Sequence, residues 1–377
     1  MLQKALVLVF ALAGIAGCMG CSTSSHFVYA TLPATSELAV YREDPFSGAL
    51  TELAGTPYTI GDGAHSVVIH TSGKFLYVAN PGQGENDISL FDIASNGYLT
   101  EIPPRIPVGN NASAPTLLLM DPSGNYLYVM NSTSDNISVF SVDSGTGVLT
   151  PLTNPLTQLP YPPFSVGGLT PLNMRLTPSG SFLYVAVSGG QVGTANGSIA
   201  GFSVNAGVLQ QLSPFLTSAD GENPNGLVVD PSGSHLYVAN TQSNSVSIFD
   251  IQSTGALTEV QGSPLSTEPY NSPFSLLIDP KGLFFYVANQ GSANVAVYSI
   301  SPTTGVLVAL TTSTSAFAFT TESSPSVLAE DPNGNYLFVG NQGNGAGIQA
   351  FGVNSGNLNP LFTYSVGNTP SSIAITQ

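Results

Sequence analysis

The chain is 377 residues long, and only 7% of its residues are charged. Its 22 acidic residues outnumber 6 basic ones, giving a formal net charge of −16. This balance argues against nucleic acid or an anionic lipid surface as a partner, because both are bound by clustered lysine and arginine.

The N-terminus reads as an export signal. Lys4 precedes an apolar run, Ala5 to Ala16, that is shorter than the about 20 residues needed to span a bilayer. Ile15-Ala16-Gly17-Cys18 resembles a bacterial lipobox, in which Cys18 carries the lipid; an ordinary cleaved signal is the alternative. We expect a lipoprotein-type signal at residues 1–18, a tether at 19–25, and an exported protein held at the cell envelope through lipid alone.

A sequence motif similar to Asp-Pro-Ser-Gly, followed by one similar to Leu-Tyr-Val-Ala-Asn, recurs about every 50 residues. Its copies centre on Tyr29, Tyr77, Tyr128, Tyr184, Tyr237, Tyr286 and Phe338. Each unit contains four short apolar runs separated by Gly-bearing turns, which predicts antiparallel strands. Stacked units of this size bury apolar faces that one unit could not bury alone.

The two chain ends complete one unit. The first copy begins at Phe27 without an initial strand, and Ser371 to Ile375 near the C-terminus matches that missing strand. We predict an all-β fold over residues 26–377: a seven-bladed β-propeller with four antiparallel strands per blade. The C-terminal strand joins the N-terminal blade and closes the ring, which removes exposed sheet edges.

The Tyr-Val-(Ala/Thr)-Asn repeats and the Asp-Pro-(Ser/Lys/Asn)-Gly turns resemble the seven-bladed propeller lactonase family, which includes 6-phosphogluconolactonases. They are also similar to the Tyr-Val-Thr-Asn repeat propellers of microbial surface proteins. The resemblance covers residues 26 to 377 and implies lactone hydrolysis. It also implies His and Arg at the starts of several inner strands, a position at which this chain has His65.

Counting back from the turn glycines aligns the first residues of the seven inner strands, which should line one mouth of a central channel. They are His65, Thr116, Leu172, Asn225, Phe274, Ser326 and Ser371. His65 is a candidate base for activating water on a lactone carbonyl. Thr116, Asn225 and Ser326, together with Glu222, are candidate ligand-binding residues; a histidine bonded only to backbone is the alternative for His65.

Arg175 stands in an aligned column that is otherwise apolar. A guanidinium there needs water, an acid or an anionic ligand, because burying it unpaired is costly. Arg175 is therefore a candidate to stabilise an oxyanion or bind an anion, and a structural pair with Glu330 is the alternative.

Acids in loops at the same mouth could hold Ca²⁺, with Asp62, Asp220 and Glu222 as possible ligands. Solvated surface acids are the alternative, and no cofactor is required by the sequence. Asp121, Asp230, Asp279 and Asp331 are expected to form turns.

Two functions remain open. The first, which the sequence favours, is a lipid-anchored, monomeric scaffold that binds an envelope protein or a glycan. The second is a hydrolase of a small neutral lactone; few basic residues are available to hold a phosphate.

Overall fold

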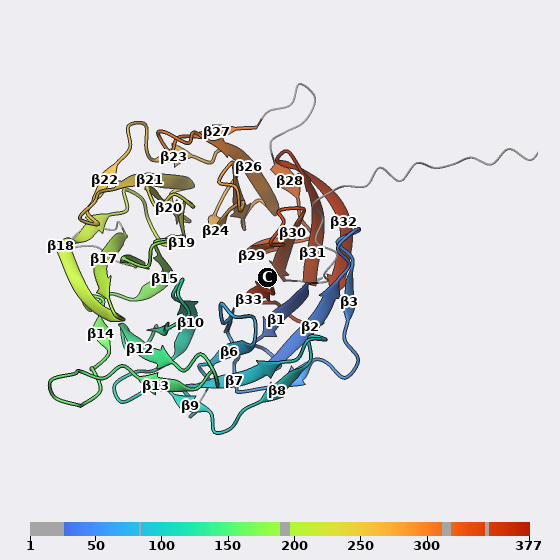
Figure 1. Cartoon of the computed structure of the whole chain (residues 1–377). Helices are drawn as coiled ribbons and strands as arrows, with labels where there is room; N and C mark the ends of the chain where they lie inside the picture. The colour runs from blue at the N-terminus through green and yellow to red at the C-terminus, as the bar shows by residue number, and fades with distance from the viewer. Residues whose placement is uncertain (1–25, 83, 189–196, 311–317, 344–346) are drawn as a thin grey trace, which may run out of the picture.

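The computed structural model describes residues 26–82, 84–188, 197–310, 318–343 and 347–377. Within these residues all regular structure is β, in seven antiparallel sheets arranged as blades around a central axis (Figure 1). This confirms the predicted seven-bladed propeller. Cys18 and the N-terminal signal lie outside the described residues, and no described helix is long and apolar enough to cross a membrane.

We number the blades from the one that contains the first strand, and give the strands of each from the channel outward. Blade 1 has β33 (Ser372–Ile375), β1 (Phe27–Leu32), β2 (Glu37–Glu43), β3 (Leu50–Glu52) and β4 (Tyr58–Thr59). Blade 2 has β5 (Ser66–Ile69), β6 (Phe75–Asn80), β7 (Asp87–Ile93), β8 (Leu99–Glu101) and β9 (Ile106–Pro107). Blade 3 has β10 (Pro115–Met120), β11 (Tyr126–Asn131), β12 (Asn136–Val142), β13 (Leu149–Pro151) and β14 (Phe164–Ser165). Blade 4 has β15 (Pro171–Leu176), β16 (Phe182–Val187), β17 (Ser198–Asn205) and β18 (Val208–Ser218).

The remaining blades follow the same order. Blade 5 has β19 (Pro224–Val229), β20 (His235–Asn240), β21 (Ser245–Ile251), β22 (Leu257–Glu259) and β23 (Leu265–Ser266). Blade 6 has β24 (Pro273–Ile278), β25 (Phe284–Asn289), β26 (Asn294–Ile300), β27 (Leu307–Ala309) and β28 (Ala318–Thr320). Blade 7 has β29 (Ser324–Glu330), β30 (Tyr336–Gln342), β31 (Gly347–Asn354) and β32 (Asn357–Ser365). In five blades a short extra strand also pairs with the third strand, whereas blades 4 and 7 have one long outer strand.

The ring closes as predicted, with the two chain ends in one sheet. β33 pairs antiparallel with β1, from Val28 opposite Ile375 to Thr31 opposite Ser372. Figure 1 shows the red C-terminal strands beside the blue N-terminal ones. The backbone N–H of Phe27 also donates to Thr376 Oγ1 at 2.8 Å, which fastens the last residues to the first strand.

The glycine between the third strand and the outer strand packs on the neighbouring blade. Gly147 has a φ of +73°, and a Cβ there would lie 2.7 Å from the ring of Phe75 in the preceding blade. The turn and the close approach therefore both require glycine. The same pairing of a turn glycine with a ring recurs at all seven junctions: Gly48 with Tyr336, Gly97 with Phe27, Gly147 with Phe75, Gly207 with Tyr126, Gly255 with Phe182, Gly305 with His235 and Gly356 with Phe284.

The repeated tyrosine ties neighbouring blades by its hydroxyl. Tyr77 is fully buried, and its hydroxyl donates to the carbonyl oxygen of Gly147 at 2.7 Å. Tyr29, Tyr184 and Tyr237 make the equivalent bond to Gly97, Gly255 and Gly305. The repeated Leu-Tyr-Val motif thus forms a strand and also supplies a contact between blades.

Candidate functional site

A cavity of about 600 Å³ occupies the central channel and is lined by inner strands of all seven blades. The seven aligned first residues all reach it: His65, Thr116, Leu172, Asn225, Phe274, Ser326 and Ser371. Because the inner strands run side by side around the axis, residues far apart in sequence meet at one level. The cavity is large enough for a sugar-sized ligand.

The second residues of the inner strands also face the channel, which strand counting missed. In β10, β15, β19, β24 and β29 the pairing register shifts directly after the initial proline. Such a bulge leaves one residue unpaired and re-aims the side chain that follows. In the bulged strands β15 and β24 this brings the polar side chains of Asn173 and Ser275 into the lining. Ser66 and Ser372 also line the cavity at the second position, in β5 and β33, where the pairing register does not shift. The Pro that precedes most first residues was the available signal, since proline lacks an N–H for the ladder.

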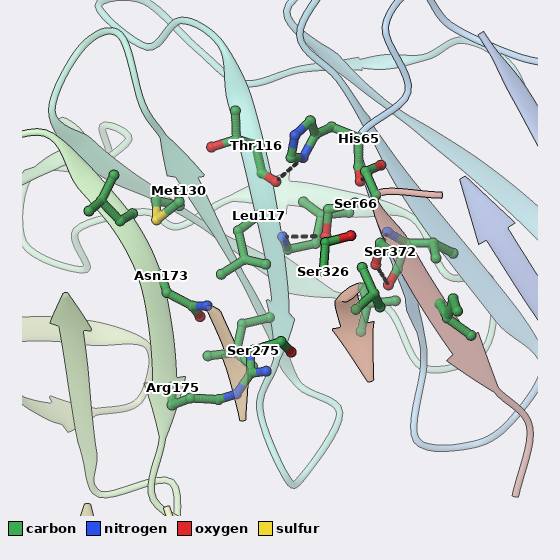
Figure 2. Close-up of a pocket in the computed structure, with 18 of the residues that line it drawn as sticks. His65, Ser66, Thr116, Leu117, Met130, Asn173, Arg175, Ser275, Ser326 and Ser372 are labelled. Atoms are coloured by element: carbon green, nitrogen blue, oxygen red, sulfur yellow. Dashed lines mark hydrogen bonds between the residues drawn. The ribbon is translucent and has the colours of Figure 1, made fainter. Parts of the chain in front are cut away.

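His65 is held in one tautomer. Its Nδ1 lies 2.9 Å from the carbonyl oxygen of Thr116, and because a carbonyl can only accept, Nδ1 carries the proton (Figure 2). Nε2 therefore keeps its lone pair, and no described residue forms a hydrogen bond with it. Burial lowers the pKa of His65, against a smaller opposing effect of the Thr116 bond, so the ring is neutral at pH 7.

The backbone beneath His65 is also fixed. The Ser371 hydroxyl donates to the His65 carbonyl oxygen at 2.6 Å, and the Thr31 hydroxyl lies 3.1 Å from the same oxygen. Ser371 belongs to the C-terminal segment and Thr31 to β1. Closure of the ring thus positions the candidate base.

Arg175 projects from β15 into the channel at a deeper level (Figure 2). Among the described residues its guanidinium makes one hydrogen bond, from Nη1 to the Met174 carbonyl oxygen at 3.3 Å. The Arg175 side chain is half-buried because it faces the cavity. Protein still surrounds the guanidinium on its other sides, and this desolvation lowers the pKa of Arg175. The alternative of a pair with Glu330 is wrong: both Glu330 carboxyl oxygens are buried and have no hydrogen-bond partner in the described part of the chain.

Glu330 instead lies beside a neighbouring turn. Burial raises its pKa to about 8, with the charges of Asp279 and Asp331 acting in the same direction. Its carboxyl group is therefore largely protonated at neutral pH. Strand β29 carries Glu330 at its last position, and the residue does not line the cavity.

Among the candidate ligand-binding residues, Thr116, Asn225 and Ser326 line the cavity, and Glu222 does not. The Glu222 backbone N–H donates to Ser243 Oγ at 2.7 Å, and its carbonyl accepts from Gln242 at 3.2 Å. These bonds tie Glu222 to the loop between β20 and β21, outside the channel wall. Glu222 is therefore not part of the channel lining, and a role for its side chain in orienting a ligand stays a prediction.

The possible calcium ligands are not brought together. Asp62 accepts from Ser36 in blade 1, whereas Asp220 accepts from Ser218 at the end of blade 4. Within the described ranges no group of three or more His, Cys, Asp or Glu side chains could hold a metal ion.

The lining has an unusual charge pattern. Its described residues include one arginine, one histidine, several hydroxyl and amide side chains, and no carboxylate. The protein as a whole carries a net charge of −16, so the channel is locally positive within an acidic molecule. Such a site favours a ligand that carries or develops negative charge.

Comparison with known proteins identifies similar chains. The family model described as "Lactonase, 7-bladed beta-propeller" matches residues 19–164 and 171–272, more than half of the chain. A 6-phosphogluconolactonase of Formosa agariphila is 42% identical over 91 residues, covering 23% of this chain and 25% of that protein. A 6-phosphogluconolactonase of Yersinia pestis is 26% identical over 207 residues, covering 54% and 58%. The match thus spans less than two thirds of the length of either relative.

Solved structures share the fold over nearly the whole chain. A candidate 6-phosphogluconolactonase of Bacteroides fragilis superposes with a TM-score of 0.76 at 19% identity, covering 96% of this chain and 99% of that one. A periplasmic gluconolactonase of Pseudomonas aeruginosa gives a TM-score of 0.75 at 19% identity, covering 94% and 99%. At such identities these likenesses establish the architecture alone.

Proposed function

Because the chain belongs to the seven-bladed β-propeller lactonase family, we propose that it hydrolyses a lactone ring in its central channel. The observation that carries this proposal is the orientation of His65. Its Nδ1 is bonded to the Thr116 carbonyl, which leaves a neutral Nε2 as a base. Hydrolysis of a cyclic ester needs such a base and donors for the developing oxyanion.

The reaction follows from that geometry. His65 Nε2 takes a proton from a water molecule as the water oxygen attacks the acyl carbon. The tetrahedral intermediate collapses by breaking the bond between the acyl carbon and the ring oxygen. The protonated His65 returns the proton to that oxygen, and the product is an open-chain hydroxy acid. The Asn225 amide, at the same channel mouth, is a donor for the developing oxyanion.

The sequence placed a binding scaffold ahead of a hydrolase, since one histidine was the sole match to the family's inner-strand pattern. Membership of the lactonase family and the fixed tautomer of His65 together favour the hydrolase. Export and a lipid on Cys18 remain proposals, supported by the N-terminal sequence.

The test is hydrolysis of lactones by the mature protein, followed by base uptake in a pH-stat. We compare the protein with His65→Asn, whose Nδ2 can replace Nδ1 in the bond to Thr116 while removing the base. We expect kcat/KM to fall 10²- to 10⁴-fold, the usual contribution of a general base, at an unchanged Tm.

The pH dependence of activity is a second test of the role of His65. Because burial lowers the pKa of His65, activity should stay level around pH 7 and decline only below the ordinary histidine value of about 6.5. Equal rates for the protein and His65→Asn would refute the role of His65. Rates no higher than spontaneous hydrolysis on every lactone would refute the hydrolase.

A further inference from the structure

Two buried acids occupy strand positions that the other blades keep apolar. Glu330 ends the inner strand β29, and the six other inner strands end in Ile69, Met120, Leu176, Val229, Ile278 and Ile375. Glu43 lies opposite Leu50 of the outer strand, and its counterparts in the other blades are Ile93, Val142, Val204, Ile251, Ile300 and Val353. The packing of a blade therefore requires an acid at neither position.

The two acids lie on opposite faces of blade 7. The apolar residues at both positions pack into the core between their own blade and the preceding one. The same register places Glu330 of blade 7 at the junction with blade 6, and Glu43 of blade 1 at the junction with blade 7. Their neighbours agree, since the charge of Asp279 in blade 6 acts on Glu330 and that of Asp331 in blade 7 acts on Glu43. Blade 7 thus meets each neighbouring blade across a buried acid.

Neither acid is compensated by a hydrogen bond. Glu43 is 1% exposed, and the carboxyl oxygens of both acids are buried without a partner in the part of the chain that the structure describes. Burial raises the pKa of each carboxyl group to about 8, and nearby acids add to this effect. Both groups are therefore largely protonated at neutral pH. Neither lines the channel, so the proposed reaction does not use them.

The titratable groups around the two acids offer little to offset a negative charge. Those around Glu330 are Asp279, Asp331, Tyr286 and the exposed Lys281, of which the lysine alone favours ionisation. Those around Glu43 are Asp331, Asp44, His26, Tyr336 and Tyr364. Asp331 belongs to both sets, and its carboxyl oxygens accept the backbone N–H groups of Asn333, Asn335 and Tyr336. Ionisation of either glutamate would thus add a buried charge beside another acid.

Both junctions of blade 7 also lack the tyrosine hydroxyl bond that ties other blades together. Tyr286 of blade 6 is fully buried, but its hydroxyl has no partner among the described residues. At the next junction Phe338 stands in place of the tyrosine. The hairpin of blade 7 has a two-residue turn, Ser355-Gly356, and blade 4 has the same short turn, opposite which the Tyr128 hydroxyl also lacks a described partner. Blade 7 is therefore docked without this bond on either face.

These observations together make blade 7 the blade whose docking depends on protons. A protonated carboxyl group can stay in an apolar junction at modest cost, whereas an unpaired carboxylate there is very costly. We propose that Glu330 and Glu43 form a proton-dependent latch, which holds blade 7 between blades 6 and 1 while both are protonated and releases it more readily as the pH rises. Strand β29 carries Ser326 into the channel lining, so the latch also holds one wall of the channel.

The direction of the pH effect follows from the two states of the latch. When blade 7 separates, both carboxyl groups meet water and their pKa returns to about 4.3. The docked form therefore binds their protons more tightly, so docking is strongest below pH 4.3 and weakens as the pH rises to about 8. Within this range each acid should raise the equilibrium constant for opening by up to about tenfold per pH unit. Above it the constant should level off.

The first test is hydrogen exchange of the intact mature protein at pH 5, 6, 7 and 8, read by mass spectrometry. Protection factors, which correct for the intrinsic exchange rate, are compared between β30 and β31 of blade 7 and the equivalent β11 and β12 of blade 3. We expect the opening constant of blade 7 relative to blade 3 to rise at least tenfold between pH 5 and 7. A ratio that does not change with pH would overturn the latch.

The second test removes the acids. Glu330→Met introduces the residue of blade 3, and Glu43→Ile introduces the residue of blades 2, 5 and 6, so both restore the apolar pattern. Each variant should reduce the pH dependence of exchange in blade 7, and the double variant should abolish it. Glu52→Gln, at an exposed position on β3, should leave it unchanged. An undiminished pH dependence in the double variant would overturn the proposal.

The third test does not depend on how the variants fold. Infrared spectroscopy of the unmodified protein distinguishes protonated carboxyl groups from carboxylates by their C=O stretching bands. We expect a band of protonated carboxyl groups at pH 6.5 that disappears above pH 8. A spectrum with carboxylates alone at pH 6.5 would show that neither acid is protonated when docked, which contradicts the latch.

Discussion

The junction between blades 2 and 3 and the junction between blades 7 and 1 show how a repeat is altered where the chain ends meet. In the first, Phe75 packs on Gly147, Tyr77 donates to the Gly147 carbonyl, and Val142 pairs with Leu149. In the second, Tyr336 still packs on Gly48, but Phe338 replaces the tyrosine and has no hydroxyl.

Glu43 is the second change at the closing junction. It pairs with Leu50 as Ile93, Val142, Val204, Ile251, Ile300 and Val353 each pair with a leucine of the outer strand. Six blades thus have a β-branched apolar residue where blade 1 has an acid. Glu43 is 1% exposed, and neither of its carboxyl oxygens has a hydrogen-bond partner among the residues that the structure describes.

Polar contacts from the chain ends compensate at this junction. His26 Nδ1 lies 2.9 Å from the Thr376 carbonyl oxygen, and its Nε2 lies 3.2 Å from Asn333 Nδ2. The Leu50 N–H donates to the Tyr364 hydroxyl at 2.8 Å. The closing junction thus keeps the repeated packing of a ring on a turn glycine and adds contacts of His26 that involve both chain ends.

Removing residues 371–377 should have the largest effect, because it takes the inner strand out of blade 1 and with it contacts to both neighbouring blades. Blade 1 would lose β33, the His26 contact and the Ser371 bond to His65. We expect loss of the single cooperative transition in urea, monitored by circular dichroism. Unfolding of the truncated protein at the same midpoint as the full chain would contradict this account.

Glu43→Ile should make the closing junction resemble the other six and stabilise the protein increasingly as pH rises. Burial, with smaller effects from Asp331 and Asp44, raises the pKa of Glu43 to about 8, above the unfolded value of about 4.3. Protonated Glu43 therefore contributes fully to the free energy of unfolding below pH 4.3. This contribution is lost as the pH rises toward 8, at up to about 1.4 kcal/mol per pH unit.

Urea unfolding at pH 5, 6.5 and 8 measures this effect. The advantage of Glu43→Ile over the protein should grow across that range, by several kcal/mol at most. Glu52→Gln, at an exposed position on β3, is the control and should change the free energy of unfolding little. A difference that is constant with pH would show that Glu43 ionises in the folded protein as it does in the unfolded chain.

Two tyrosine substitutions have the smallest expected effects and test whether the hydroxyl bond between blades stabilises an ordinary junction. Tyr77→Phe removes the bond to Gly147 and should cost about 1 kcal/mol. Tyr128 is equally buried, but its hydroxyl has no partner, so Tyr128→Phe should be neutral or slightly stabilising. Thermal unfolding of both variants checks this, and equal losses would show that the hydroxyl bond between blades contributes nothing.

The architecture was readable from the sequence because its signals are local and repeated. The turn motif, the apolar runs and the unmatched ends specify seven units and their closure, and the pairing of β1 with β33 confirms it. Counting along each strand also placed His65, Thr116 and Asn225 at one end of the channel, since strand position determines depth.

The side-chain arrangement of the site depended on tertiary structure. Bulges after the initial prolines turn Asn173 and Ser275 into the channel, which simple strand alternation does not predict. The backbone of Glu222 bonds to a neighbouring loop, and Glu222 does not line the channel. Glu330 lies against the turn at Asp279 and does not pair with Arg175. The periodic pattern of this chain specifies its blades by itself. The chemistry of the channel is set by the few side chains that depart from that pattern, because what each of them meets is decided by register across neighbouring blades.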